Sequence, residues 1–197
     1  MYIDVRFNKL RGVSQLERRT LIKASGGGLL FLLLGLGTKS QASQPSSLIR
    51  PPGTTSDSHF LASCLRCGQC AQVCTCDAIV MAGVEKGLSV GTPYIIPRKQ
   101  PCNLCMDCVD VCPSGAILPV EKENAGMGLA RVDKDRCVSW KGDICMSCYF
   151  RCPFYARGII LEDHTKPVVV DSVCVGCGIC EYVCILNPPA IVVEKRG

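Results

Sequence analysis

Residues 102–113 read Cys-Asn-Leu-Cys-Met-Asp-Cys-Val-Asp-Val-Cys-Pro, which is the spacing C-x2-C-x2-C-x3-C-P. Cysteines this close together on a tight loop can converge three thiolates on one metal cluster, while the fourth cysteine points away from the other three. Backbone N–H groups in such a loop can also turn toward the sulfur atoms. The run therefore predicts a ligand loop for a [4Fe–4S] cluster.

The same order of cysteines occurs three more times along the chain. The four motifs occupy residues 64–74, 102–112, 137–152 and 174–184, and the third has seven residues between its first two cysteines instead of two. Four motifs predict four [4Fe–4S] clusters. The sixteen cysteines expected to bind iron are Cys64, Cys67, Cys70, Cys74, Cys102, Cys105, Cys108, Cys112, Cys137, Cys145, Cys148, Cys152, Cys174, Cys177, Cys180 and Cys184.

Zinc and disulfide bonds explain this spacing less well. Structural zinc sites usually use paired C-x2-C knuckles, which give no reason for a triple C-x2-C-x2-C run. Cysteines three residues apart are awkward disulfide partners, and the count of seventeen leaves one cysteine over. The 197 residues include only one Trp and ten Phe and Tyr, so the apolar core is small and bound clusters would supply the missing cross-links.

Two questions about the ligands stay open at the level of the sequence. Cys76, the seventeenth cysteine, is either a small buried side chain beside the first loop or a ligand that exchanges with Cys74. The x3 spacing favours Cys74 as the ligand. In proteins with two clusters the fourth cysteine of one motif binds the cluster of another motif. Both a sequential pairing (one with two, three with four) and a nested pairing (one with four, two with three) satisfy the ligand count.

Short apolar runs beside the motifs predict strands, and we expect the fourth cysteine of each motif to begin a short helix. Repetition of strand, loop, helix and strand predicts an α+β fold of two ferredoxin-like modules of the bacterial 2[4Fe–4S] type, with short elements and little regular structure. Residues 83–99 and 121–127 are the expected connectors, because they are rich in Gly, Pro and charge. The predicted strands are residues 78–80, 116–118, 129–133, 159–161, 168–171 and 190–193.

The net charge of +5 comes from the beginning of the chain. Residues 1–42 contain seven Lys and Arg and two acidic residues, whereas residues 43–197 contain fifteen of each sign. The larger part is therefore neutral as a polypeptide and becomes anionic when its thiolates bind clusters. This distribution argues against a nucleic-acid-binding protein.

The basic segment is predicted to be an export signal. Residues 17–23 read Glu-Arg-Arg-Thr-Leu-Ile-Lys, which matches the twin-arginine signal of bacteria. The apolar stretch 24–37 is shorter than the roughly 20 residues of a membrane-spanning helix, and a small-residue cleavage site ends at Ala42. We predict a leader at 1–42, cleaved or retained as an anchor, and a polyferredoxin body at 43–197.

With these motifs in place, the chain resembles the NapG/MauM family of periplasmic ferredoxin-type proteins. The resemblance extends from Arg50 to about Val193 and includes the twin-arginine leader and the x7 gap of the third motif. It is carried by Arg-Pro-Pro-Gly at 50–53, Gly-Leu-Ser-Val-Gly-Thr-Pro-Tyr at 87–94, Val-Cys-Pro-Ser-Gly-Ala at 111–116, Met-Gly-Leu-Ala at 127–130 and Cys-Val-Gly-Cys-Gly-Ile-Cys at 174–180.

The resemblance implies a periplasmic electron carrier with four [4Fe–4S] clusters, exported by the twin-arginine translocase. Its partner would be a membrane-embedded quinol oxidase of the NapH/MauN type, and electrons would continue to a periplasmic redox partner such as a nitrate reductase system. The MauM branch is tied to methylamine utilisation instead. No catalytic residue is expected, because His59 and His164 lack a Ser or Cys partner motif. Trp140 is expected to pack over the third cluster.

Two other classes of function stay open. The chain could be the electron-transfer subunit of a molybdenum-type oxidoreductase, a class that also carries four clusters and often uses the nested pairing. It could also be a maturation factor that supplies electrons while another periplasmic enzyme acquires its cofactor. A large subunit that co-purifies with the chain would favour the first of these, and growth phenotypes on nitrate and methylamine would separate the second from a respiratory relay.

Overall fold

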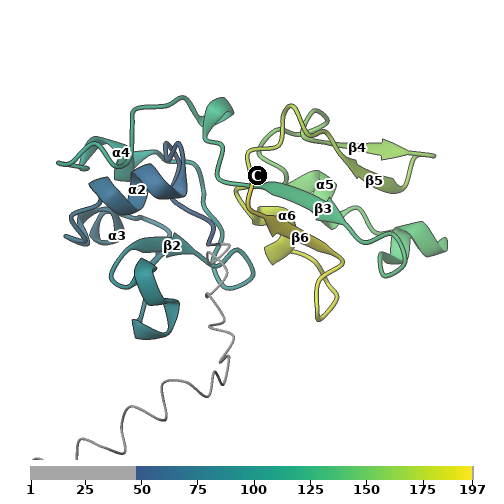
Figure 1. Cartoon of the computed structure of the whole chain (residues 1–197). Helices are drawn as coiled ribbons and strands as arrows, with labels where there is room; N and C mark the ends of the chain where they lie inside the picture. The colour runs from purple at the N-terminus through teal and green to yellow at the C-terminus, as the bar shows by residue number, and fades with distance from the viewer. Residues whose placement is uncertain (1–47, 197) are drawn as a thin grey trace, which may run out of the picture. The chain divides into compact units, whose positions relative to one another are not determined.

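A computed structural model describes residues 48–196, so the predicted leader lies outside the described residues. The described elements are short, and the longest helix among them has seven residues. None of the helices in this range is long and apolar enough to cross a membrane. In chain order (Figure 1) the elements are α2 (Asp57–Ser63), α3 (Gln69–Gln72), β1 (Ile79–Met81), the 3-10 helix η1 (Val84–Ser89), β2 (Pro93–Ile95), α4 (Asp107–Asp110), η2 (Lys122–Asn124), β3 (Leu129–Val132), η3 (Val138–Lys141), α5 (Ser147–Arg151), β4 (Ile159–Glu162), β5 (Lys166–Val169), α6 (Ile179–Tyr182) and β6 (Ile191–Glu194).

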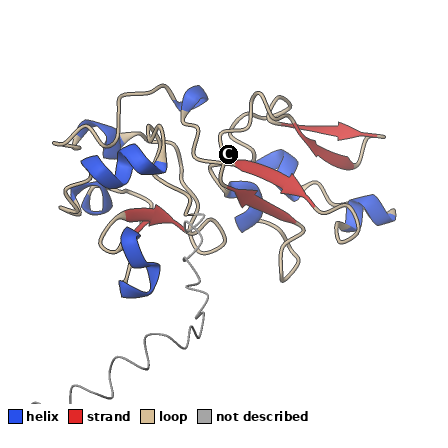
Figure 2. Cartoon of the chain, in the orientation of Figure 1, coloured by secondary structure: helices blue, strands red, loops and turns tan. Residues whose placement is uncertain are grey.

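The strands form three antiparallel pairs, which Figure 2 shows in red among long tan loops. β1 pairs with β2, β3 with β6, and β4 with β5. The β4–β5 hairpin lies, in sequence, inside the β3–β6 pair. The third motif therefore connects β3 to β4, and the fourth motif connects β5 to β6.

Residues 48–120 also contain two motifs and an antiparallel strand pair, β1 with β2, but the backbone contacts outside this pair do not form a second pair of strands. Ile49 forms an isolated bridge with Ile95 of β2, and the Leu118 N–H donates to the Gly53 carbonyl at 3.0 Å. The predicted strand at 116–118 is wrong, because this single backbone bond does not form a ladder. β2 was missed, because Pro93 and the glycines around it indicate a connector. The other five predicted strands are confirmed within a few residues.

The core is a single cluster of small and branched side chains with many cysteines among them. Phe60 of α2 is completely buried, and it lies under the guanidinium of Arg50, whose carbon is 4.9 Å from the ring centre. Arg50 is itself only 4% exposed. Its guanidinium donates to the carboxylate of Asp57 at 2.8 Å, to the Thr92 hydroxyl at 2.8 Å and to the Ser89 hydroxyl at 3.1 Å. Arg50 thus ties α2 to the segment between η1 and β2.

Candidate metal centres

Three of the four motifs share one loop conformation, which depends on two residues with left-handed backbone. These are the second residue after the first cysteine and the residue after the second cysteine. In the fourth motif both are glycines, Gly176 (φ +74°) and Gly178 (φ +86°), for which this backbone costs little. The left-handed residues turn the chain sharply between successive cysteines. The equivalent residues elsewhere are Arg66, Gly68, Leu104 and Met106.

The third cysteine of each motif lies in a one-turn helix, and the fourth follows the end of that helix. In the first motif the Gln72 N–H donates to the Gly68 carbonyl at 3.1 Å, so the helix begins directly after this left-handed glycine. The expectation that the fourth cysteine begins the helix is wrong, because the turn is already complete before Cys74. Cys70, Cys108, Cys148 and Cys180 lie in the helices, and Cys74, Cys112, Cys152 and Cys184 follow them.

The third motif reaches its geometry in another way. Met146, which stands where the other motifs have a left-handed residue, has φ −120°. The extra residues form η3, whose Ser139 is completely buried. The Ser139 hydroxyl donates to the Cys145 carbonyl and accepts from the Cys145 N–H at 3.2 Å. Ser139 therefore closes the seven-residue gap and holds Cys145 near Cys137. The sequence offered no signal for this role beyond the gap itself.

Three cavities are each lined by four of the predicted ligands. In every case three cysteines come from one motif and the fourth comes from the neighbouring motif. The cavities enclose about 340, 390 and 360 Å³ of empty space, open mouths included. The sets are Cys64, Cys67, Cys70 and Cys112 (site 1), Cys137, Cys145, Cys148 and Cys184 (site 3), and Cys174, Cys177, Cys180 and Cys152 (site 4).

The remaining four predicted ligands, Cys102, Cys105, Cys108 and Cys74, are assigned together as site 2, because the hydroxyl of Thr75, the residue after Cys74, lies 3.7 Å from the Cys105 sulfur. Burial raises the pKa of Cys108 to about 12, with further contributions from the charges of Cys102, Cys70, Cys105 and Cys74. The arrangement thus exchanges the fourth cysteines between motifs one and two, and between motifs three and four.

The donors around the cysteines suit a bound cluster. Backbone N–H groups point at six of the sulfur atoms, with donor–sulfur distances of 3.3–3.5 Å. Such bonds stabilise thiolate sulfur, and they are among the means by which proteins tune iron–sulfur clusters. Gly158 leaves the space that Cys152 needs, because a Cβ at this position would come within 2.9 Å of the Cys152 sulfur. The residues present therefore fit a [4Fe–4S] group.

The buried thiols are held in their protonated form while no metal is bound. Burial raises the pKa of Cys102 and of Cys148 to about 12, and it raises the pKa of Cys70 to about 11. Cys180 is shifted in the same direction by burial and by its neighbouring thiols. Iron ligands must be thiolates, so loading these sites releases protons.

Cys76 lies beside a ligand rather than in the ligand sets above. Its sulfur is 3.7 Å from the Cys74 sulfur and 3.6 Å from the Pro101 carbonyl oxygen. Ser114 has the same place in the second motif, since its hydroxyl is 3.7 Å from the Cys112 sulfur. This correspondence supports Cys74 as the ligand and Cys76 as a neighbour that can donate a hydrogen bond to it.

His59, His164 and Trp140, which are not predicted ligands, do not line any of the three cavities. His59 is exposed on α2, where its ring is 3.4 Å from the Ser63 hydroxyl, and His164 lies in the tight turn between β4 and β5. The Trp140 indole donates to the Pro167 carbonyl at 3.2 Å, and Pro167 lines site 3. Trp140 therefore backs the wall of site 3 and does not line it. Within residues 48–196 no three His, Cys, Asp or Glu side chains converge closely enough to hold a single metal ion.

A family model described as "4Fe-4S dicluster domain" matches residues 101–156. The match spans motifs two and three, whereas the cavities join motif one with two and motif three with four. Together with the cysteine sets, the match defines the chain as an iron–sulfur electron-transfer protein of the ferredoxin type.

Curated relatives then identify the family. The chain is 40% identical to the ferredoxin-type protein NapG of Escherichia coli (strain K12), over 85% of this chain and 79% of that protein. It is 35% identical to NapG of Haemophilus influenzae over 89% and 70% of the two chains. It is 33% identical to the methylamine utilization ferredoxin-type protein MauM of Methylophilus methylotrophus over 88% and 82%. The chain belongs to the NapG/MauM family of ferredoxin-type proteins.

Proposed function

We propose that the chain is a periplasmic relay that carries four [4Fe–4S] clusters and passes electrons from a membrane-embedded quinol-oxidising partner to a periplasmic reductase system of the nitrate-reductase type. The observation that carries this proposal is that three cavities are each lined by four predicted ligands, three from one motif and the fourth from its neighbour. Export by the twin-arginine route, with a leader at 1–42, belongs to the same proposal.

The proposed architecture consists of two ferredoxin-like modules. Residues 48–120 hold sites 1 and 2, and residues 128–196 hold sites 3 and 4. The nesting of β4–β5 within β3–β6 supports this division, and so does the exchange of fourth cysteines inside each half.

At each site the chain supplies the cysteine ligands, backbone hydrogen-bond donors and an apolar wall. A [4Fe–4S] cluster, when bound, would supply reversible one-electron transfer. The cysteines would bind its irons, the backbone N–H groups would stabilise the sulfur atoms, and the apolar cavity walls would exclude water. Burial and hydrogen bonding of this kind set the potential of a cluster. No side chain is required to transfer protons to a substrate.

The pairing of motifs bears on the alternative functions. A molybdenum-type electron-transfer subunit often uses the nested pairing, and the cavities instead support the sequential one. A methylamine role stays in competition, because MauM proteins match most of the chain at 33–37% identity. The identity to NapG of Escherichia coli (40%) lies above this range and that to NapG of Haemophilus influenzae (35%) lies within it, so the preference for the nitrate system rests on the Escherichia coli relative.

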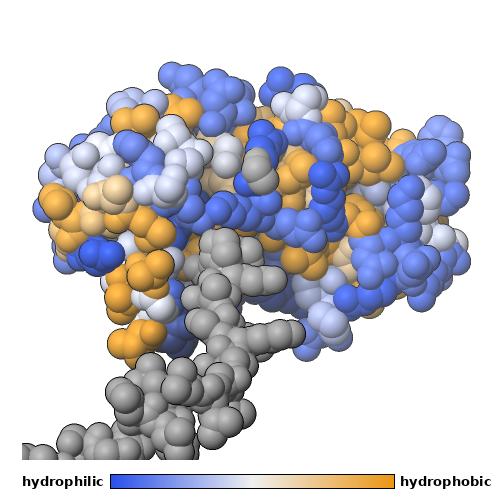
Figure 3. Space-filling view, viewed as in Figure 1, coloured by the Kyte–Doolittle hydropathy of each residue, from blue (hydrophilic) through white to orange (hydrophobic). Residues whose placement is uncertain are grey.

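Exposed apolar side chains near site 1 support a membrane-embedded partner. Leu65 lines site 1 and is 67% exposed. Val84 and Leu88 of η1 are 88% and 84% exposed, and the end of η1 is joined to the site 1 loop, because the Arg66 guanidinium donates to the Val90 carbonyl at 2.9 Å. Figure 3 shows hydrophobic surface in orange at the lower left, over the segment that lies below β2 in Figure 1. We propose that the membrane partner binds here and delivers electrons to the half that contains site 1.

The function is tested by reduction of the anaerobically purified protein with quinol and membranes. Bleaching of the cluster absorbance should require both quinol and the membrane partner, so membranes from a strain without that partner should leave the protein oxidised. Deletion of the gene should impair growth with nitrate as the electron acceptor and spare growth on methylamine. A defect on methylamine alone would reject the nitrate assignment in favour of the MauM-type role.

A further inference from the structure

Residues 97–102 belong to the first half of the body, yet they lie against the fourth motif. The Cys102 N–H donates to the Cys177 carbonyl at 2.9 Å. The backbone of Gly178 approaches Pro97 so closely that a Cβ on this glycine would come within 2.4 Å of the Pro97 Cβ. Two ligand-bearing loops from different motif pairs are therefore in direct contact.

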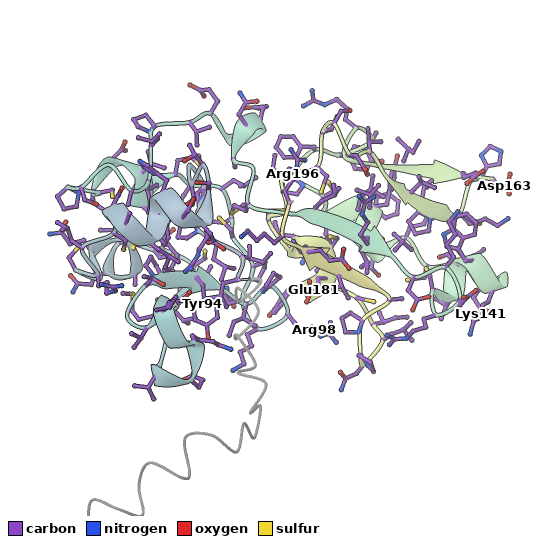
Figure 4. All side chains as sticks on the ribbon, viewed as in Figure 1. Tyr94, Arg98, Lys141, Asp163, Glu181 and Arg196 are labelled. Carbon is purple, nitrogen blue, oxygen red and sulfur yellow. The ribbon has the colours of Figure 1, made fainter. Side chains whose placement is uncertain are left out.

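Arg98 makes the most extensive of these contacts. One terminal nitrogen of its guanidinium donates to the carbonyls of Glu181 (2.9 Å), Tyr182 (3.2 Å) and Cys184 (2.9 Å). The other donates to the Leu186 carbonyl at 2.8 Å. Figure 4 shows Arg98 and Glu181 close together. The accepting carbonyls lie at the end of α6 and just beyond it, where a helix leaves its last C=O groups without partners.

These bonds place a positive charge beside a predicted ligand. Cys184 supplies the fourth thiol of site 3, and Arg98 donates directly to its backbone carbonyl. Glu181 is 7% exposed, and its carboxylate accepts from the Val193 N–H at 2.7 Å. The carboxylate is thus engaged with β6, and the guanidinium remains directed at the carbonyls around Cys184.

We propose that Arg98 is a positioning residue for site 3, so that the first half of the body sets the shape and the charge of a site in the second half. This inference rests on the proposed function, because it assumes that Cys137, Cys145, Cys148 and Cys184 bind a cluster. Arg98 fixes the loop that presents Cys184. Its charge stabilises the reduced cluster, which is the more negative form, and so raises the potential of that site.

The guanidinium is needed for its shape as well as its charge. A planar fork can donate to several carbonyls at fixed angles, whereas a lysine ammonium is a compact charge on a flexible stem. Arg98→Lys therefore keeps the charge near site 3 but loses some of the hydrogen bonds to the carbonyls that follow α6. Arg98→Met loses both. Lys99→Met is the matched control, because Lys99 is the next residue, is exposed, and loses the same charge.

The test is a redox titration of the anaerobically loaded variants, followed by EPR, with iron content and thermal unfolding measured on the same samples. Arg98→Met should lower the midpoint potential of one cluster and leave the other three unchanged, and its unfolding temperature should fall. Arg98→Lys should unfold earlier than the native chain but show a smaller shift in potential. Lys99→Met should match the native chain in both measurements.

If Arg98→Met loses iron, the site concerned is identified with a second substitution. Loss from site 3 predicts that Arg98→Met combined with Cys184→Ala contains no less iron than Cys184→Ala alone, which supports the proposal. Further loss in the double variant would overturn it, as would four unchanged potentials in a fully loaded Arg98→Met. A native chain without four clusters would refute the proposed function instead, so the two failures are distinguishable.

Discussion

The identity of each ligand set depends on single cysteines at the ends of short helices. Cys112 belongs to the second motif in sequence but lines site 1 with Cys64, Cys67 and Cys70. The sequence could not choose between the sequential and nested pairings, because the gap of three residues before the fourth cysteine is the same in every motif. The cavities distinguish the two because they show which fourth cysteine faces which loop.

Double substitutions test this exchange. Cys112→Ala and Cys64→Ala should each remove about four irons, and so should the double variant, because both residues serve site 1. Cys112→Ala combined with Cys102→Ala should remove about eight irons, because two sites are then lost. Iron analysis with spin quantification measures both. The reverse pattern, in which Cys112 and Cys102 behave as members of one site, would contradict the exchange.

At the scale of elements, the third motif shows how an irregular spacing is accommodated. Ser139 in η3 bonds both backbone groups of Cys145. Removal of a buried hydroxyl that satisfies two partners costs about 1–3 kcal/mol. Ser139→Ala should therefore lower the unfolding temperature and release about four irons, those of site 3.

The matched control for that substitution is Ser172→Ala, since Ser172 is exposed. It should leave both the iron content and the unfolding temperature of the chain unchanged. Equal iron content in Ser139→Ala and the control would show that η3 does not hold site 3 together.

The sequence predicted which cysteines line the three cavities, but not how the fourth cysteines are exchanged, and it predicted five of the six strand positions. Cysteine spacing identified the four loops, because the ligands must lie close together in the chain to converge. The strand at 116–118 was wrong and β2 was missed, since pairing in such short strands depends on tertiary contacts rather than on apolar runs. Leu104 and Met106 adopt left-handed backbone without being glycine, so composition gave no sign of their conformation. The contacts of Arg98 join residues more than eighty positions apart and have no local signature.

At the scale of the whole molecule, Arg50 and Asp57 anchor the beginning of the described body to its end. Burial alone would raise the pKa of Asp57, but hydrogen bonds from Lys195 and Arg50 outweigh burial and lower it. The stabilisation from this lowered pKa is complete at neutral pH, above the unfolded value of about 3.9, and is lost only as the pH falls through the folded value.

Arg50→Met should destabilise the protein strongly. It leaves a largely buried carboxylate with one fewer partner, and loss of one member of a buried ion pair costs about 3–5 kcal/mol. Arg131→Met is the control, because the Arg131–Asp171 pair is more than half exposed and contributes about 0–1 kcal/mol. Thermal unfolding at pH 7 compares the two. Similar losses of stability in the two variants would show that the Arg50 network stabilises the fold no more than an exposed ion pair does.

The exposed apolar side chains of η1 lead to a prediction about binding of the membrane partner. Val84→Lys with Leu88→Lys should reduce binding to membranes that contain the partner by roughly tenfold or more, since each exposed apolar side chain buried on binding contributes on the order of 1 kcal/mol. Ile144→Lys is the control, because Ile144 is 78% exposed but lies in the other half. Co-sedimentation measures the effect. Equal loss from Ile144→Lys would place the contact elsewhere.

The most direct test of four clusters in sequentially paired sets is anaerobic purification followed by iron and sulfide analysis with EPR. We expect about sixteen irons and sixteen sulfides per chain, and spectra of four reduced [4Fe–4S] clusters that interact magnetically. Twelve irons or fewer in a fully folded protein, or zinc in place of iron and sulfide, would contradict it.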